Sequence, residues 1–108
     1  MISSQMLKGT LEGCILKVIS RKETYGYEIS ESLKEYGFAD ISEGTIYPLL
    51  LRLEKNGYIR ADYRESPVGP RRKYFSITAA GGQELESFVY SWEELKKAVD
   101  TLFERIEE

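Results

Sequence analysis

The fold is decided by residues 42–59, SEGTIYPLLLRLEKNGYI, which predict one amphipathic helix. Ser42 is a candidate N-cap and Gly57 stands just past the expected end, as glycine often does. Apolar residues recur between them at helical spacing, and this inward stripe consists of Ile46, Leu49, Leu50 and Leu53. On a wheel of about 100° per residue, the opposite face carries Gly44, Thr45, Pro48, Leu51, Arg52 and Lys55. Glycine and proline in the first turns favour contact with another surface over helix stability.

The start of this helix has the properties of a nucleic-acid contact. Free N–H groups and a partial positive charge suit phosphates or base acceptors, and the major groove admits a helix of this size. The expected contacts on the helix are Ser42, Gly44, Thr45, Tyr47, Pro48, Arg52 and Lys55. Thr45 would face a base edge, Tyr47 would donate to a phosphate, and the two cations would bind backbone charge.

A structural interpretation of the same residues stays open. Exposed Arg and Lys usually form only a solvated face, and Gly with Pro often just marks a helix start. Pro48 also costs one backbone hydrogen bond if the helix begins after Ser42, and none if the cap lies near Thr45.

The flanking segments complete a small mixed fold. Apolar spacing predicts helices over Met6–Ser20 and Gly26–Tyr36, the second capped by Gly37. After the central helix, YIRADYRES and RKYFSI alternate with period two around the turn SPVGP, which predicts a two-stranded hairpin. Three helices followed by a hairpin are the winged helix-turn-helix plan. The expected fold class is therefore mainly α with a small β-hairpin (α+β), with a DNA-binding domain over residues 1–78.

Residues 79–108 predict a long last helix, capped by Thr78, that serves dimerisation. Its apolar residues are spaced 3, 4, 3, 4, 3, 4, which is a heptad seam. The expected dimer interface consists of Leu85, Phe88, Trp92, Leu95, Val99, Leu102 and Ile106. Such a rod is roughly 40 Å long, which exceeds the expected width of the domain, so its far half needs a partner. Two recognition helices joined in this way would grip half-sites of an inverted-repeat operator about one DNA turn, ~34 Å, apart.

Charge is divided unevenly along the chain, although the net charge is −3. Residues 42–77 carry seven Lys or Arg against four Asp or Glu, whereas residues 78–108 carry three against eight. A local basic surface can attract a polyanion even when the whole protein is acidic. Within the hairpin, or wing, the expected DNA contacts are Arg71, Arg72, Lys73 and Tyr74, with Arg60 and Arg64 beside them. The same tyrosine also suits a purely structural role in a strand.

Composition argues against an enzyme. The chain has no histidine, and its lone cysteine, Cys14, lies among apolar residues where a small side chain would pack. No residues pair a nucleophile with a base, so we expect no catalytic site, no metal and no cofactor. No stretch approaches the ~18 apolar residues of a membrane span, and the first residues lack the pattern of a secretory signal. The expectation is a cytoplasmic protein without membrane contact.

Four segments resemble the PadR family of bacterial and archaeal transcriptional regulators. They are YGYEI (Tyr25–Ile29), EGTIYPLLLRLEKNGYI (Glu43–Ile59), GPRRKYFSIT (Gly69–Thr78) and the tryptophan of YSWEEL. The resemblance implies a homodimeric winged-helix repressor, often released from its operator by a small molecule. The single short last helix is similar to the subfamily with a minimal C-terminal region. In drug-responsive members of that subfamily the tryptophan that matches Trp92 contacts a flat aromatic ligand at the dimer interface.

Two alternatives follow from this resemblance. Trp92 would either bind such an effector or simply pack against the other subunit, as a large apolar seam residue does. The domain as a whole would be either a DNA-binding regulator or a winged-helix protein-interaction module that has lost DNA binding. The basic wing and the small, polar outward face of the central helix favour the regulator.

Overall fold

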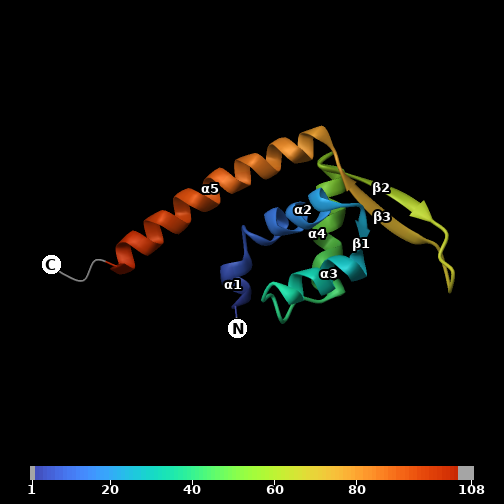
Figure 1. Cartoon of the computed structure of the whole chain (residues 1–108), viewed down its shortest axis with the longest axis horizontal. Coiled ribbons are helices and arrows are strands. Elements are labelled where there is room, and N and C mark those ends of the chain that lie inside the picture. Colours follow the sequence, from blue (N-terminus) through green and yellow to red (C-terminus); the bar gives the residue numbers. More distant parts are fainter. Residues whose placement is uncertain (1, 105–108) are drawn as a thin grey trace.

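The computed structural model describes residues 2–104 and is mainly helical with one small antiparallel sheet (Figure 1). The elements are α1 (Ser4–Leu7), α2 (Leu11–Arg21), β1 (Thr24–Tyr25), α3 (Gly26–Glu35), α4 (Glu43–Lys55), β2 (Ile59–Arg64), β3 (Arg72–Ile77) and α5 (Ala79–Glu104). Helices α2, α3 and α4 pack together, β2 and β3 extend from one end as the wing, and α5 extends toward the other. The α+β winged helix-turn-helix class is confirmed.

The first predicted helix is divided into two, so the expectation of one helix over Met6–Ser20 is wrong. Helix α1 begins at a cap in which the Ser3 hydroxyl accepts from the Met6 N–H at 3.2 Å. It ends before Gly9, which adopts a φ of +87°, and the Thr10 hydroxyl donates to the Leu7 carbonyl. A left-handed glycine reverses the chain direction, so α2 begins anew at Leu11.

The expected hairpin of β2 and β3 is present, and the sheet has a third strand that was not predicted, since its order is β1-β3-β2. Strand β3 pairs with β2 in a register that runs from Ile59 opposite Ile77 to Arg64 opposite Arg72. Its other edge pairs with β1, where Tyr25 lies opposite Tyr74. Because β1 leads directly into α3, these ladder bonds fasten the wing to the helical core.

The core lies between α2, α3, α4 and the base of the sheet. It consists of Leu11, Ile15, Leu16, Ile19, Ile29, Leu33, Ile41, Ile46, Leu50, Leu53, Ile59 and Phe75. The inward stripe of α4 is confirmed, since Ile46, Leu50 and Leu53 are buried and Leu49 is half-buried against the cluster. Cys14 also packs half-buried at the edge of this core.

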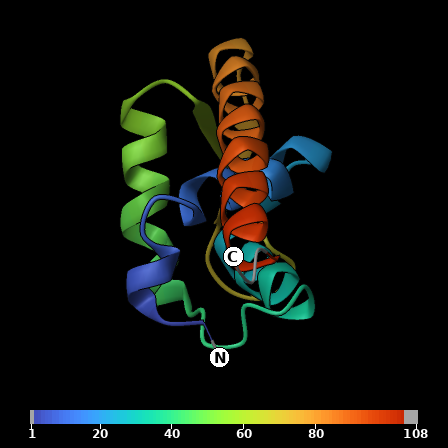
Figure 2. The ribbon, with the colours of Figure 1, turned by 90° about the vertical axis from the view of Figure 1, so that its left-hand side faces the viewer.

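Within residues 2–104, helix α5 packs on the domain through its first three turns. The Thr78 hydroxyl caps it by accepting from the Gly81 N–H at 3.0 Å. Leu85 packs on the core, and the Phe88 ring covers Gly13 of α2. From Val89 to Glu104 every side chain is exposed, and the helix leaves the body of the molecule (Figures 1 and 2). None of the helices between residues 2 and 104 is both long and apolar enough to cross a membrane.

Candidate nucleic-acid interface

Ser42 caps the start of α4, which resolves the two alternatives for Pro48. The Ser42 hydroxyl accepts from the Thr45 N–H at 3.4 Å, and its carbonyl accepts from the Ile46 N–H at 3.1 Å. Pro48 therefore lies in the helix interior, where its ring nitrogen has no hydrogen to donate to the carbonyl of Gly44. The sequence keeps a proline on this face at the cost of one helical hydrogen bond.

The outward face of α4 is open to solvent. Its exposed residues are Gly44, Thr45, Pro48, Leu51, Arg52 and Lys55, as the helical wheel predicts. Among residues 2–104, a Cβ added at Gly44 would meet only the Ser42 hydroxyl, at an ordinary 3.7 Å. Packing within this chain therefore does not require glycine at that position. Leu51 is 59 % exposed and adds an apolar surface in the middle of the same face.

One flank of α4 faces α3 and the wing. The Tyr47 ring lies over Gly26 at the start of α3, and its hydroxyl donates to a Glu43 carboxylate oxygen at 3.4 Å. Partial burial, followed by the charge of Glu43, raises the pKa of Tyr47, so the hydroxyl keeps its proton. Glu54 on the same side pairs with Lys73 of β3 at 3.2 Å and joins α4 to the wing.

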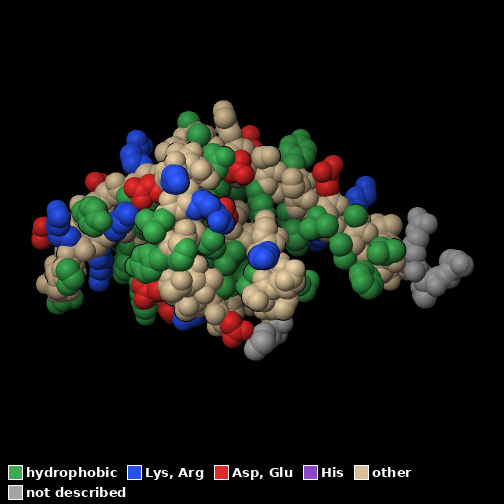
Figure 3. Space-filling model, turned by 180° about the vertical axis from the view of Figure 1, so that it is seen from behind, with side chains coloured by type: hydrophobic (Ala, Val, Ile, Leu, Met, Phe, Trp, Pro, Cys, Tyr) green, Lys and Arg blue, Asp and Glu red, His purple; other side chains and the backbone are tan. Residues whose placement is uncertain are grey.

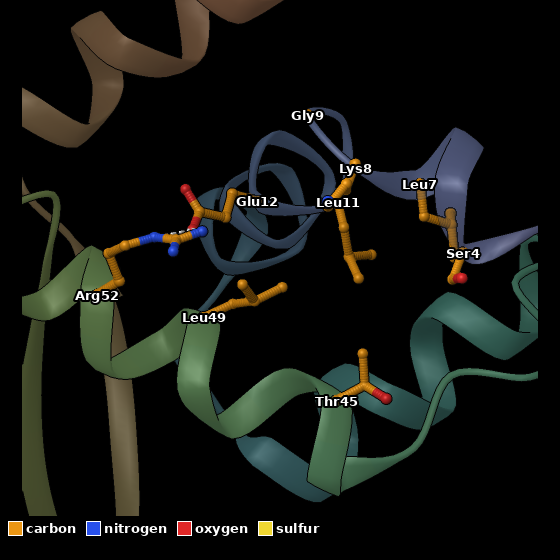
Figure 4. Close-up of a pocket in the computed structure, with 9 residues that line it drawn as sticks. All are labelled: Ser4, Leu7, Lys8, Gly9, Leu11, Glu12, Thr45, Leu49 and Arg52. Atoms are coloured by element: carbon orange, nitrogen blue, oxygen red, sulfur yellow. Dashed lines mark hydrogen bonds and ion pairs between the residues drawn. The ribbon is translucent and has the colours of Figure 1, made fainter.

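The opposite flank of α4 faces the α1–α2 junction (Figure 4). Thr45, Leu49 and Arg52 point from α4 toward Leu11 and neighbouring residues, around a hollow of about 270 Å³. Arg52 closes one end of this hollow through an ion pair with Glu12 of α2, in which Nε donates to Oε2 at 2.6 Å. The Arg52 side chain remains 62 % exposed.

Aromatic rings support the cations of the wing. The Arg72 guanidinium lies over the Tyr25 ring at 4.5 Å, and Arg64 lies over Tyr74 at 4.8 Å. The two tyrosine rings contact each other with their centroids 5.2 Å apart. A cation over an aromatic face is held by the ring quadrupole and keeps its outer N–H groups free. Tyr74 therefore serves here as a support for an arginine.

The tip of the wing is built in the same way. Arg71 lies over the Tyr63 ring at 5.4 Å, and both side chains are exposed. Figure 3 shows Lys and Arg side chains gathered over the wing, at the end of the molecule away from the end of α5. The sequence-predicted wing residues are thus brought together on one end of the sheet, although Lys73 is half-buried and shared with Glu54.

Sequence reasoning missed the residues that hold these cations. Glu12 binds Arg52, Glu23 binds Arg64 at 2.7 Å, and Tyr25 lies under Arg72. The two carboxylates are 40 and 41 residues away from their arginines, so no local spacing identifies the pairs. Among the residues that the structure describes, no group of acidic, cysteine or histidine side chains is arranged to hold a metal ion.

Transcriptional regulators are among the known proteins that this chain resembles in sequence and fold. Residues 15–87 match the model of the transcriptional regulator PadR-like family. A PadR-like transcriptional regulator of Bacillus cereus is 50 % identical, with a TM-score of 0.85 over 97 % of this chain and 100 % of that one. A Streptococcus transcriptional regulator is also 50 % identical, with a TM-score of 0.81 over 93 % and 98 % of the two chains. A transcriptional regulator of Mycobacterium tuberculosis is 32 % identical over 79 % of this chain and 78 % of its own length.

Proposed function

Because this chain belongs to the PadR-like family of transcriptional regulators, we propose that it acts as a homodimeric repressor that binds an inverted-repeat operator. The observation that carries the proposal is the face of α4, which is exposed, begins with Gly44 and includes an interior Pro48. Neither residue serves the stability of its own helix. Both leave a flat, open approach for the major groove of a duplex.

Base readout falls to the first turns of α4. The Thr45 hydroxyl is exposed and lies 3.3 Å from that of Ser42, so the two groups together offer a donor and an acceptor to base edges. Leu51 offers an apolar contact to a thymine methyl group. Lys55, at the end of the helix, has no ion pair within residues 2–104 and is free to neutralise a phosphate.

The wing would bind the DNA backbone, and its arginines are held in place before binding. Arg71 and Arg72 lie over tyrosine rings, so less side-chain freedom is lost when a phosphate is bound. The ladder from β1 through β3 to β2 keeps these residues at a fixed position relative to α4. The wing thereby supplies affinity that does not depend on sequence, while α4 supplies the sequence preference.

Dimerisation falls to the exposed half of α5. Trp92, Leu95, Val99 and Leu102 are 42 %, 52 %, 42 % and 70 % exposed, and all belong to the heptad seam. An apolar seam of this kind is normally covered by another helix. The last predicted seam residue, Ile106, lies outside the described residues. Leu85 and Phe88 contact their own domain, so they would border the interface rather than form its centre.

A small aromatic effector would bind where two copies of Trp92 meet. Trp92 is partly exposed and has no aromatic partner among the described residues, so a flat ring between two such side chains would fill the seam. Such a ligand would change the spacing of the two α4 helices and thereby the affinity for the operator. A ligand that quenches Trp92 fluorescence without changing operator affinity contradicts this coupling.

The proposal is tested by recovering bound genomic fragments, for which we expect an inverted repeat. Arg72→Ala with Lys73→Ala should weaken binding to all duplexes and reduce the log–log salt slope by about 0.9 for each phosphate that the wing no longer neutralises. Lys17→Ala, on the exposed surface of α2, is the matched control and should leave the slope unchanged. Thr45→Ala should instead alter the sequence preference.

Two outcomes count against this function. If the wing variants keep the wild-type affinity and slope, the wing does not touch the backbone. If no genomic fragment is recovered and a protein partner is captured instead, the domain is an interaction module.

A further inference from the structure

We infer that Glu12 is a positioning residue for DNA binding, which holds Arg52 so that its free edge meets a phosphate beside the recognition helix. The inference rests on the proposed function and adds to the DNA-binding surface a residue that lies outside α4 and the wing. Glu12 belongs to α2, and no motif in the sequence connects it with nucleic acid. Its connection to the interface is visible only in the folded chain (Figure 4).

The ion pair uses one side of the guanidinium and leaves the other free. Nε and Nη2 of Arg52 both contact the same Glu12 oxygen, Oε2. A guanidinium carries five N–H donors in a fixed planar fork. Two of these donors are directed to Glu12, which leaves the outer Nη1 side available. That remaining edge is suited to two parallel hydrogen bonds with a phosphate.

Of the two paired side chains, that of Glu12 is the more buried. The Glu12 side chain is 32 % exposed, whereas that of Arg52 is 62 % exposed. A carboxylate that competed with DNA for the arginine would have to lie on the outer side, between the guanidinium and the duplex. Here Arg52 is the more accessible of the two side chains, and Glu12 is the more buried one.

This arrangement reduces the cost of ordering a long side chain. A free arginine samples many rotamers, and binding a phosphate removes that freedom. Glu12 fixes Arg52 before DNA arrives, as the tyrosine rings fix Arg71 and Arg72 in the wing. The two edges of the proposed surface thus use different supports for the same purpose.

Charge alone predicts the opposite effect, which makes the inference testable. Removing an acidic residue makes the protein less negative and should strengthen its attraction to DNA. If Glu12 positions Arg52, its removal should weaken binding instead. Exposed ion pairs contribute up to about fivefold in an equilibrium constant, so we expect Glu12→Ala to weaken binding about two- to fivefold for each half-site.

The experiment is a double-mutant cycle on the full-length protein with a recovered operator. Affinity is measured for wild type, Glu12→Ala, Arg52→Ala and the double variant, with thermal melting to check the fold. Glu12→Ala should weaken binding in the wild-type background and should no longer weaken it once Arg52 is absent. Glu12→Gln keeps an acceptor oxygen and should recover part of the affinity. Glu31→Ala, which breaks the surface pair with Lys34 on α3, removes the same charge as the control.

Each other outcome overturns the inference. If Glu12→Ala binds DNA more strongly, Glu12 competes with DNA for Arg52. If Glu12→Ala weakens binding equally in the wild-type and Arg52→Ala backgrounds, Glu12 has only a structural role. If Arg52→Ala leaves affinity unchanged while wing variants weaken it, the proposed function stands and only this inference fails. If the wild-type protein binds no duplex, the proposed function fails as well.

Discussion

Replacing Leu95 with alanine should weaken the dimer without affecting the fold of the monomer. Leu95 is 52 % exposed, lies in the free half of α5 and is absent from the core cluster and the residues packed on it. Its exposed part therefore has nothing to cover it within residues 2–104. If a second copy covers it, the substitution removes an intersubunit contact and little else.

The magnitude follows from the exposed fraction. Complete burial of a leucine side chain is worth about 1.5–3 kcal/mol, so covering half of one contributes roughly 0.8–1.5 kcal/mol. A symmetric dimer contains the residue twice, which gives about 1.5–3 kcal/mol per dimer. Since each 1.4 kcal/mol is a factor of ten, the dissociation constant should rise about 10- to 150-fold.

Sedimentation equilibrium over a dilution series measures this constant directly. Tyr90→Ala is the matched control, because Tyr90 is 78 % exposed on the same helix but lies on the side away from the seam. Its removal should leave the dissociation constant nearly unchanged. A wild-type protein that stays monomeric, or a larger effect of Tyr90→Ala than of Leu95→Ala, would refute the assignment of the interface.

Two further predictions concern the folded domain. Gly81→Ala should destabilise it by about 1–3 kcal/mol, because a Cβ there would enter the Tyr58 carbonyl and the Ile77 side chain. Gly82 has open space around it, so Gly82→Ala should instead stabilise α5 by about 0.5–1 kcal/mol in thermal or chemical unfolding. Equal effects of the two variants would contradict the close contact of Gly81 with Tyr58 and Ile77. Burial raises the pKa of Cys14 above its ordinary value of 9.0, so alkylation at pH 8 should be slower in the native than in the unfolded protein. Because the pKa of Cys14 is raised in the native state, the contribution of this thiol to stability is complete below pH 9.0 and is lost as the pH rises through the native pKa. If the native and unfolded proteins were alkylated at the same rate, the burial of Cys14 would be contradicted.

Local periodicity predicted those parts of the fold that are fixed by local sequence. The inward stripe of α4 and the alternation that places Phe75 and Ile77 on one side of the hairpin follow from apolar spacing, and both are present. The apolar pattern did not predict the break at Gly9, because Leu7 and Leu11 are four residues apart and the helical spacing continues across it. Only the φ of +87° at Gly9 marks the change of direction.

Tertiary contacts account for what the sequence did not predict. Strand β1 has two residues and no period of its own, and it exists because β3 offers an edge to Thr24 and Tyr25. The partners of Arg52 and Arg64 likewise come from elements far away in the chain. The proposed DNA contacts could therefore be named from residue type, but the groups that hold them in place could not.

The composition of α4 separates the residues that stabilise this helix from those that would contact DNA. Relative to alanine, Pro48 costs about 3 kcal/mol in the helix interior, and Gly44, in the first turn, costs at most about 1 kcal/mol. Burial of Ile46, Leu50 and Leu53 contributes about 1.5–3 kcal/mol each, which offsets that cost with a few kcal/mol remaining. The helix thus depends on its inward face for stability, and the residues of its outward face are free to serve contact. Replacing Gly44 and Pro48 by alanine should therefore make α4 more stable, while the added side chain would stand where we propose that DNA comes close.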